Sequence, residues 1–238
     1  MLRLIPPITT LLTTLVLTAR LGVAAAPEHQ PPDSASTGTV VGRVRLTTRV
    51  KGAALPSTAY PTRSVGSLDT YTIPEIRNVV VYVKDAAFRG PLAATRAEMR
   101  QEHETFVPHV IAIPRGSTVD FPNADPIFHN VFSLSSAASF DLRRYPSGQS
   151  RSWQFTKPGI VKVYCHIHSH MSATILVLDH PYFTIPEVDG TFTLANLPPG
   201  EHTLVGWHER VGERRATVTI ERGKTSTVDL SLPVAEPQ

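Results

Sequence analysis

The sequence predicts an all-β protein, and three observations support this fold class. Short stretches in which apolar and polar residues alternate, or in which β-branched residues follow one another, recur along most of the 238 residues. Between these stretches stand 21 prolines and 14 glycines, which favour turns. Helical periodicity is nearly absent. Many short strands separated by turns are typical of a β-sandwich or a β-barrel.

The chain begins with the features of an exported protein. Arg3 precedes an apolar run (8–19), and small residues (24–26) end the segment. This order is typical of a secretory signal peptide, which we expect to be cleaved after Ala26. A membrane anchor is the alternative, but the run is shorter than the roughly 20 residues that a spanning helix needs. We therefore expect no stable membrane insertion, and we expect the polar stretch that follows (27–38) to be a disordered tether.

The β pattern then continues to the end of the chain. The predicted strands cover 39–46, 78–85, 109–123, 129–135, 150–155, 159–165, 172–179, 190–197, 202–209 and 215–220. The segment AATRAEMRQEHE (93–104) is the one stretch rich in good helix formers, although a strand is compatible with it as well.

The charge of the chain does not indicate a nucleic-acid partner. The formal net charge of +3 includes Arg3 and Arg20, so removal of the signal peptide leaves 3 − 2 = +1. No run of arginine or lysine is present. A protein that binds nucleic acid through a basic surface would need such a concentration of positive charge.

The stretch VYCHIHSHM (163–171) holds an unusual set of metal-binding side chains. It contains the only cysteine, Cys165, with three of the ten histidines and one of the three methionines. A single cysteine in an exported chain cannot form an internal disulfide, so it bonds outside the chain, reacts or binds a metal. Thiolate, thioether and imidazole together are the ligands that copper prefers.

The spacing of these residues suggests one particular copper site. Cys165, His168 and Met171 follow one another as C-x2-H-x2-M after a predicted strand, and His129 stands upstream at the start of another strand. Two histidines, one cysteine and a weak axial methionine form the donor set of a blue-copper site. A buried cysteine or a methionine that fills a core is the simpler interpretation of each residue alone, but the joint spacing favours a metal. His166 and His170 alternate with His168 and are expected to point away from it.

Two segments resemble the cupredoxins, and most closely the plastocyanin and amicyanin group, whose relatives include methylamine-utilisation proteins. They are FPNADPIFHNVFS (121–133) and YCHIHSHMSATILV (164–177), and the resemblance extends over residues 91–180. It implies a Greek-key barrel with one type 1 copper ion. By this resemblance the copper ligands are His129, Cys165, His168 and Met171, and Asn130 ties the two ligand segments together by hydrogen bonds.

The two ends of the chain resemble a different fold. VDGTFTLANLPPGEHTLVGWHERVGERRATVTIERGKTSTVDLSL (188–232) is similar to the second half of a carboxypeptidase regulatory-like domain, a small Ig- or transthyretin-like β-sandwich. GTVVGRV (38–44) and NVVVYVKD (78–85) resemble its opening.

This second resemblance implies a discontinuous sandwich, formed by 39–90 and 181–232, into which the copper domain (91–180) is inserted. With this insertion, residues 51–76 would be an unusually long loop of the sandwich. The alternative to an insertion is a series of consecutive pieces in which the N-terminal strands join the copper domain.

The expected function is single-electron transfer in the periplasm, with a dehydrogenase or a cytochrome as the redox partner. Protein side chains fill every strong position around the copper, so no place is left for a substrate and we expect no enzymatic activity. A binuclear purple-copper centre would need two bridging cysteines. A multicopper oxidase would have histidine on both sides of the cysteine, whereas Tyr164 precedes Cys165.

Two other functions remain open from the sequence. The protein could be a periplasmic copper-binding or trafficking protein in which His166 and His170 help to capture the metal. The sandwich could instead act as a carbohydrate-binding-like module, with Trp207 as one contact.

Overall fold

The computed structural model describes residues 36–47, 74–84 and 86–234. Apart from one short 3-10 helix, η2 (Glu75–Asn78), every regular element in these ranges is a β-strand, so the all-β prediction is confirmed. The predicted signal peptide, most of the tether and most of the 51–76 loop lie outside the described residues. None of the helical structure in the described ranges is long and apolar enough to span a membrane.

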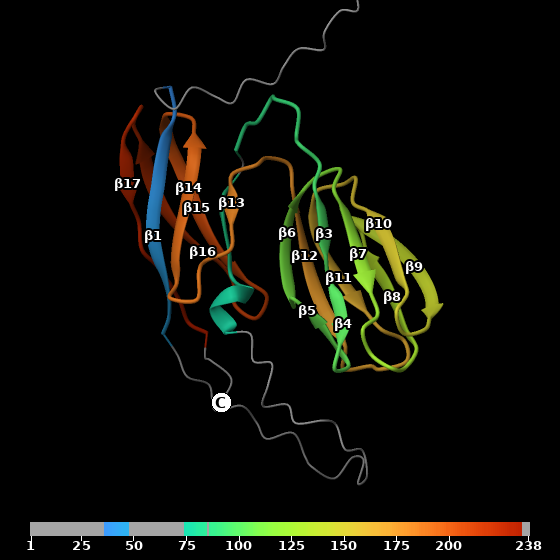
Figure 1. The fold of residues 1–238 in the computed structure, drawn as a ribbon. Helices are drawn as coiled ribbons and strands as arrows, with labels where there is room; N and C mark the ends of the chain where they lie inside the picture. Colours follow the sequence, from blue (N-terminus) through green and yellow to red (C-terminus); the bar gives the residue numbers. More distant parts are fainter. Residues whose placement is uncertain (1–35, 48–73, 85, 235–238) are drawn as a thin grey trace, which may run out of the picture. The chain divides into compact units, whose positions relative to one another are not determined.

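Two sheets combine strands from both ends of the described chain (Figure 1). In the first, β1 (Gly38–Leu46) pairs antiparallel with β14 (Thr191–Leu197) and parallel with β17 (Thr225–Thr227) and β18 (Leu230–Leu232). The second has the order β13 (Phe183–Thr184), β2 (Val80–Val83), β15 (Gly200–His208) and β16 (Gly212–Ile220). One cluster of buried apolar side chains includes Val40, Val81, Phe192, Leu204 and Leu232.

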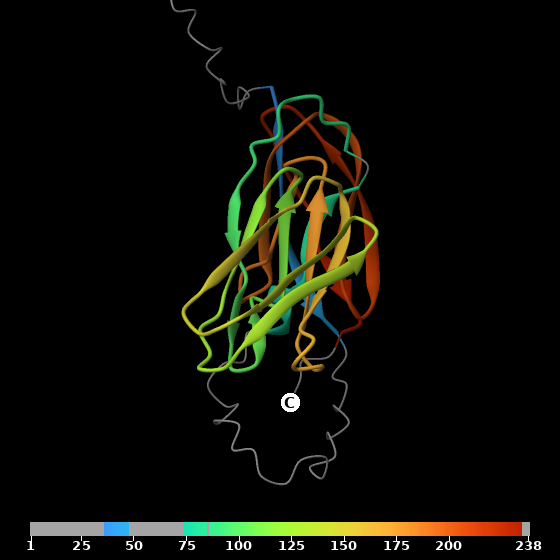
Figure 2. The same cartoon turned by 90° about the vertical axis from the view of Figure 1, so that its right-hand side faces the viewer.

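Residues 96–178 form three further sheets (Figure 1 and Figure 2). The five-stranded sheet has the order β6 (Val110–Pro114), β12 (Ser172–Leu178), β11 (Gly159–Tyr164), β8 (His129–Ser135) and β9 (Ala138–Tyr145). The three-stranded sheet has the order β10 (Ser150–Gln154), β7 (Thr118–Pro122) and β3 (Arg96–Glu98). A small hairpin joins β4 (Arg100–Glu102) to β5 (Thr105–Val107).

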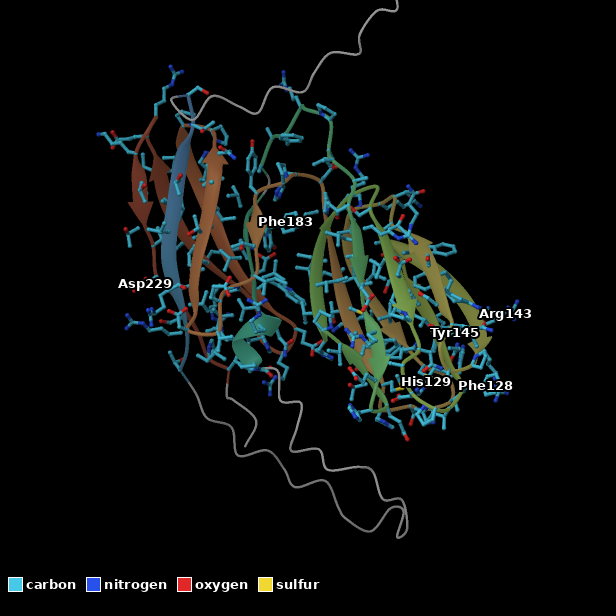
Figure 3. All side chains as sticks on the ribbon, in the orientation of Figure 1. Phe128, His129, Arg143, Tyr145, Phe183 and Asp229 are labelled. Atoms are coloured by element: carbon cyan, nitrogen blue, oxygen red, sulfur yellow. The ribbon has the colours of Figure 1, made fainter. Side chains whose placement is uncertain are left out.

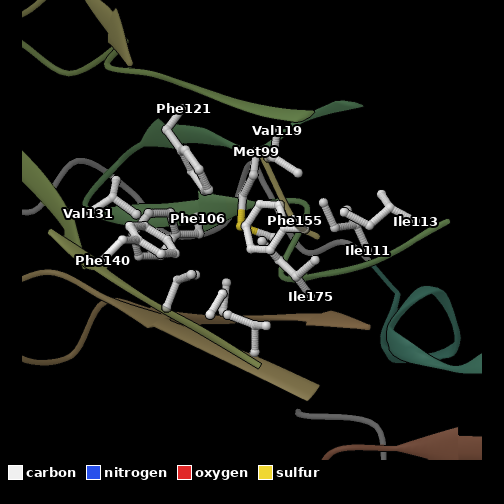
Figure 4. Packing of buried hydrophobic residues seen from close by; sticks show 14 of the residues in the cluster. Met99, Phe106, Ile111, Ile113, Val119, Phe121, Val131, Phe140, Phe155 and Ile175 are labelled. Atoms are coloured by element: carbon white, nitrogen blue, oxygen red, sulfur yellow. The ribbon is translucent and has the colours of Figure 1, made fainter. Parts of the chain in front are cut away.

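An aromatic and aliphatic core lies between the sheets of this middle segment (Figure 4). The ring of Phe140 packs against Phe121 in a tilted arrangement and against Phe155 edge to face. The core also contains Cys165 and Met171. Two of the candidate ligands therefore belong to the apolar core of this segment.

Strand β12 shows how side-chain alternation divides two cores. Ala173, Ile175 and Val177 belong to the aromatic core. Leu176 points to the opposite face, where it joins a cluster with Val205 and Trp207. Because successive side chains of a strand point to opposite faces, an apolar run such as SATILVL can be buried on both sides.

The strand predictions were correct at most positions, but they differ from the structure in several places. The stretch 109–123 forms two strands, β6 and β7, separated by a turn in which Gly116 has a φ of 94°. The stretch 93–104 forms β3 and β4 and no helix. Strand β9 was not predicted, and its alternation is irregular: its pairing with β8 shifts register next to Asn130, and Arg143 has a φ of 62°.

Candidate metal centre

Two separate segments bring His129, Cys165 and His168 together. His129 begins β8, Cys165 directly follows β11, and His168 lies on the loop that leads into β12. Figure 3 labels His129 and its neighbour Phe128 at one end of these strands. The imidazole of His129 is fully buried, and Cys165 and His168 are buried as well. The site is therefore set into the end of the fold, and folding of β8 onto β11 assembles it.

The three inward-facing atoms form a nearly isosceles triangle. The Nδ1 atoms of His129 and His168 are 3.0 Å apart, and the Cys165 Sγ lies 3.9 Å from the first and 4.0 Å from the second. A triangle with these sides has a circumscribed radius of about 2.1 Å. Bonds from a first-row metal such as zinc to imidazole nitrogen and to thiolate sulfur measure about 2.0–2.1 Å and about 2.3 Å. A single metal ion therefore fits among the three atoms.

Met171 supplies a buried thioether on the same loop. Its backbone N–H donates to the His168 carbonyl at 3.0 Å, and its own carbonyl accepts from the Cys165 N–H at 3.3 Å. These two bonds close the loop into a compact turn. The Met171 side chain is buried in the same apolar cluster as Cys165. The described residues thus place all four predicted ligands in one neighbourhood.

The electrostatic surroundings favour the thiolate form of Cys165. Burial by itself raises the pKa of a thiol, because the charged form loses its hydration. The neighbouring His129 ring and the backbone of Asn130, His168 and Ile167 outweigh burial and hold the pKa of Cys165 below its usual value. The thiolate is the form that binds metals.

Asn130 connects the two ligand segments. Its Oδ1 accepts a hydrogen bond of 2.6 Å from the backbone N–H of His166, one residue after the cysteine. Its Nδ2 donates to Asp141 at 3.4 Å. The β8 strand and the ligand loop are therefore joined by a side chain that stands next to His129 in the sequence.

His166 and His170 lie outside the triangle. The ring of His166 stacks on Phe132, with ring centroids 3.7 Å apart and planes 5° from parallel. His170 is exposed, and its Nε2 lies 3.6 Å from a Glu104 carboxylate oxygen. Neither ring shares the buried space that the other two histidines occupy.

Sequence reasoning missed Asp125. Its carboxylate Oδ2 lies 2.8 Å from the Nε2 of His129, on the side of the ring opposite to Cys165. The available signal was an acidic residue four positions before a predicted ligand, within the turn sequence PNADP. Turns commonly contain aspartate for local hydrogen bonding, so this signal did not separate a role at the metal site from a role in the turn.

The comparisons with known proteins concern part of the chain. No protein-family model matches the sequence, and no curated protein matches it. Among solved structures, a copper-containing nitrite reductase from Thermus scotoductus SA-01 is 27% identical over 40% of this chain and 24% of its own, with a TM-score of 0.33. A purple cupredoxin from Nitrosopumilus maritimus is 22% identical over 34% of this chain and 99% of its own, with a TM-score of 0.32.

A mutant of amicyanin in its Cu(I) form is 17% identical over 41% of this chain and 98% of its own, with a TM-score of 0.33. Because all three TM-scores lie below 0.5, the assignment of the site depends on its own geometry and donor chemistry.

Proposed function

We propose that this chain is an exported cupredoxin-type protein that holds one type 1 copper ion and carries single electrons. The observation that carries the proposal is the buried triangle of one thiolate and two imidazole Nδ1 atoms, with a buried methionine on the same loop. This donor set is typical of blue-copper electron-transfer sites. We assign the three strong ligand positions to His129, Cys165 and His168 and the axial position to Met171.

The chemistry that copper supplies in this donor set is the exchange of one electron between Cu(II) and Cu(I). The part played by the chain is to keep the ligands in place in both states. β8 and β11 are strands of one sheet, Asn130 links β8 to the ligand loop that follows β11, and the aromatic core includes Cys165 and Met171. Ligands that do not move between oxidation states keep the reorganisation small, which favours fast transfer.

Three exposed apolar side chains stand next to proposed ligands in the sequence. They are Phe128 beside His129, Tyr164 beside Cys165 and Ile167 beside His168. We infer that they form an apolar rim, which lets a redox partner approach the ligands without desolvating charge. We propose that the partner is a periplasmic dehydrogenase or cytochrome that docks on this rim, after cleavage of the signal peptide has released the protein into the periplasm.

We also propose that the copper-binding segment is inserted into a discontinuous sandwich of 39–90 and 181–232. The pairing of β1 with β14, β17 and β18, and of β2 with β13 and β15, supports this division. Both pairs of segments flank the residues that carry the copper ligands. The long separation in sequence between the paired strands is what an insertion requires.

Voltammetry of the copper-loaded protein tests the proposed function. We expect a reversible one-electron couple and fast electron self-exchange between the oxidised and reduced protein, and we expect Cys165→Ser to lack both. A copper-trafficking protein would show no reversible couple and would pass its copper to a soluble chelator. That result would contradict electron transfer and favour the trafficking function.

A further inference from the structure

We propose that Asp125 and Glu104 are positioning residues that lower the redox potential of the copper site, because each places a carboxylate behind the outer nitrogen of one imidazole ligand. The inference depends on the proposed copper site and adds to it a determinant of the potential. The two carboxylates belong to different segments, and the turn between β4 and β5 brings them to the site.

Asp125 fixes the orientation of His129. An ionised carboxylate can only accept hydrogen bonds, so the His129 Nε2 at 2.8 Å is the protonated nitrogen. The Nδ1 that faces Cys165 is then left with its lone pair, which is the form that binds a metal. Both side chains are almost completely buried, with 0% and 8% of their surfaces exposed. Water therefore cannot replace the carboxylate as the partner of this ring.

The β4–β5 turn holds the Asp125 carboxylate in place. The backbone N–H groups of His103 and Glu104 donate to its two oxygens at 2.6 and 2.8 Å. Both residues have left-handed backbone angles, with φ values of 54° and 55°. Residues other than glycine adopt this conformation at a cost, and here it directs two consecutive N–H groups at one carboxylate. Asn123 accepts the backbone N–H of Asp125 at 3.0 Å and fixes the other side.

The same turn directs the Glu104 side chain at the second imidazole. Its Oε2 lies 4.0 Å from the Nε2 of His168 and 3.6 Å from the Nε2 of His170. The Glu104 side chain is only 20% exposed, so its charge is partly shielded from water. The Nδ1 of His168, on the other side of the ring, belongs to the metal triangle. Each imidazole is thus placed between the metal position and a carboxylate.

Carboxylates in these positions change the relative stability of the two oxidation states. A carboxylate that accepts the outer N–H of a ligand histidine makes the ring a stronger donor. Its negative charge also stabilises the more positive Cu(II) more than Cu(I), and the effect is strengthened in a buried site of low polarity. The expected result is a lower potential.

The test is the midpoint potential of copper-loaded variants in one buffer. We expect Asp125→Asn to lower the affinity for Cu(II) relative to that for Cu(I) by about tenfold or more, as for other partners of metal-bound histidines. For one electron this corresponds to a potential raised by ~59 mV per tenfold change. Glu104→Gln is expected to raise the potential by less, because its carboxylate lies further from the ring and is more exposed.

The matched control is Asp179→Asn. It removes the same charge from an exposed residue, whose ion-pair partner among the described residues is Arg115. We expect its potential to equal that of the unaltered protein. Since the Glu104 side chain is partly exposed, Glu104→Gln provides a measurement even where Asp125→Asn disturbs folding.

Asp125→Asn and Glu104→Gln could both give blue proteins whose potentials shift no more than that of Asp179→Asn. That result would overturn this inference and leave the proposed copper site intact. A lower potential in either variant would overturn it as well. An unaltered protein that forms no coloured copper site would instead contradict the proposed function itself, and with it the inference.

Discussion

The role of each histidine near the site follows from how its ring is held. His129 and His168 are buried with their Nδ1 atoms facing each other and the cysteine. His166 is exposed and held against Phe132 by stacking, and 61% of the His170 side chain is exposed. Only the first two rings have lost the surrounding water that would compete with a metal for their lone pairs.

Alanine substitution of single histidines should therefore separate ligands from neighbours. We expect His168→Ala to abolish the absorption of the copper-loaded protein or to make it dependent on added imidazole. We expect His166→Ala and His170→Ala to keep most of the absorption, because neither ring faces the triangle. Visible spectra of the three variants, recorded at equal copper loading, provide the measurement. Equal losses in all three would indicate a loose copper-trapping loop.

The sequence could predict the four ligands but not Asp125, the residue that binds the outer nitrogen of His129. The C-x2-H-x2-M spacing and the upstream His129 could be identified, because a short loop after a strand leaves few ways to arrange its side chains. Asp125 could not, because its position depends on the β4–β5 turn, which lies about twenty residues earlier in the chain. The donors to Asp125 are backbone N–H groups. Every residue except proline has one, so the sequence does not show which residues bind this carboxylate.

At the scale of whole elements, β1 lies so close to a neighbouring backbone segment that one of its positions has no room for a side chain. A Cβ added to Gly42 would lie 1.8 Å from the carbonyl oxygen of Val228. The N–H of Val228 donates to the carbonyl of Val41 at 3.0 Å, so the two backbones are held against each other. The space that glycine leaves lets the chain pass close to β1 between β17 and β18.

Gly42→Ala should consequently destabilise the protein strongly. Overpacking typically costs about 1–3 kcal/mol, and we expect about 3 kcal/mol or more because the blocking atom belongs to the backbone. Thr193→Ala is the control, since Thr193 is an exposed residue of β14 paired with Val41. We expect a change within about 0.5 kcal/mol for it. Urea unfolding monitored by circular dichroism compares them, and similar midpoints would contradict the close packing at Gly42.

The strands that the sequence predicted best are those whose burial alternates or is continuous. β8, β12 and β14 were identified with nearly the observed bounds for this reason. β17 and β18 were not predicted, because each is only three residues long and pairs with β1 from far along the chain. Such strands owe their conformation to the sheet they join more than to their own residues.

At the scale of the whole molecule, one carboxylate forms polar contacts with residues from several parts of the chain. Glu209, just after β15, accepts hydrogen bonds from Lys162 at 2.7 Å and from Thr174 at 3.0 Å, and it lies 2.5 Å from the Nε2 of His109. The bond with His109, aided by Lys162, holds the pKa of Glu209 well below its usual value despite burial. These partners belong to or precede three strands of the five-stranded sheet.

Because the pKa of Glu209 is lowered in the folded protein, its contribution to stability decreases as the pH falls. A glutamate whose pKa is lower in the folded state stabilises the protein above its unfolded pKa of about 4.3, and this contribution is lost as the pH falls towards the folded value. We expect Glu209→Gln to lose less stability than the unaltered protein between pH 7 and pH 3. Denaturant midpoints at both pH values measure this, with the exposed Glu201→Gln as control. An identical loss in Glu209→Gln would show that Glu209 does not contribute.

The measurement that tests the central claim most directly is the visible absorption spectrum of the purified protein after addition of Cu(II). A thiolate at Cys165 bound together with two imidazoles predicts an intense thiolate-to-copper charge-transfer band, a blue or green colour, that reaches its maximum at one copper per chain. Cys165→Ser should remove the band while leaving the β-sheet circular dichroism unchanged. A colourless protein whose Cys165 thiol reacts freely with a thiol reagent in the presence of copper would contradict the account.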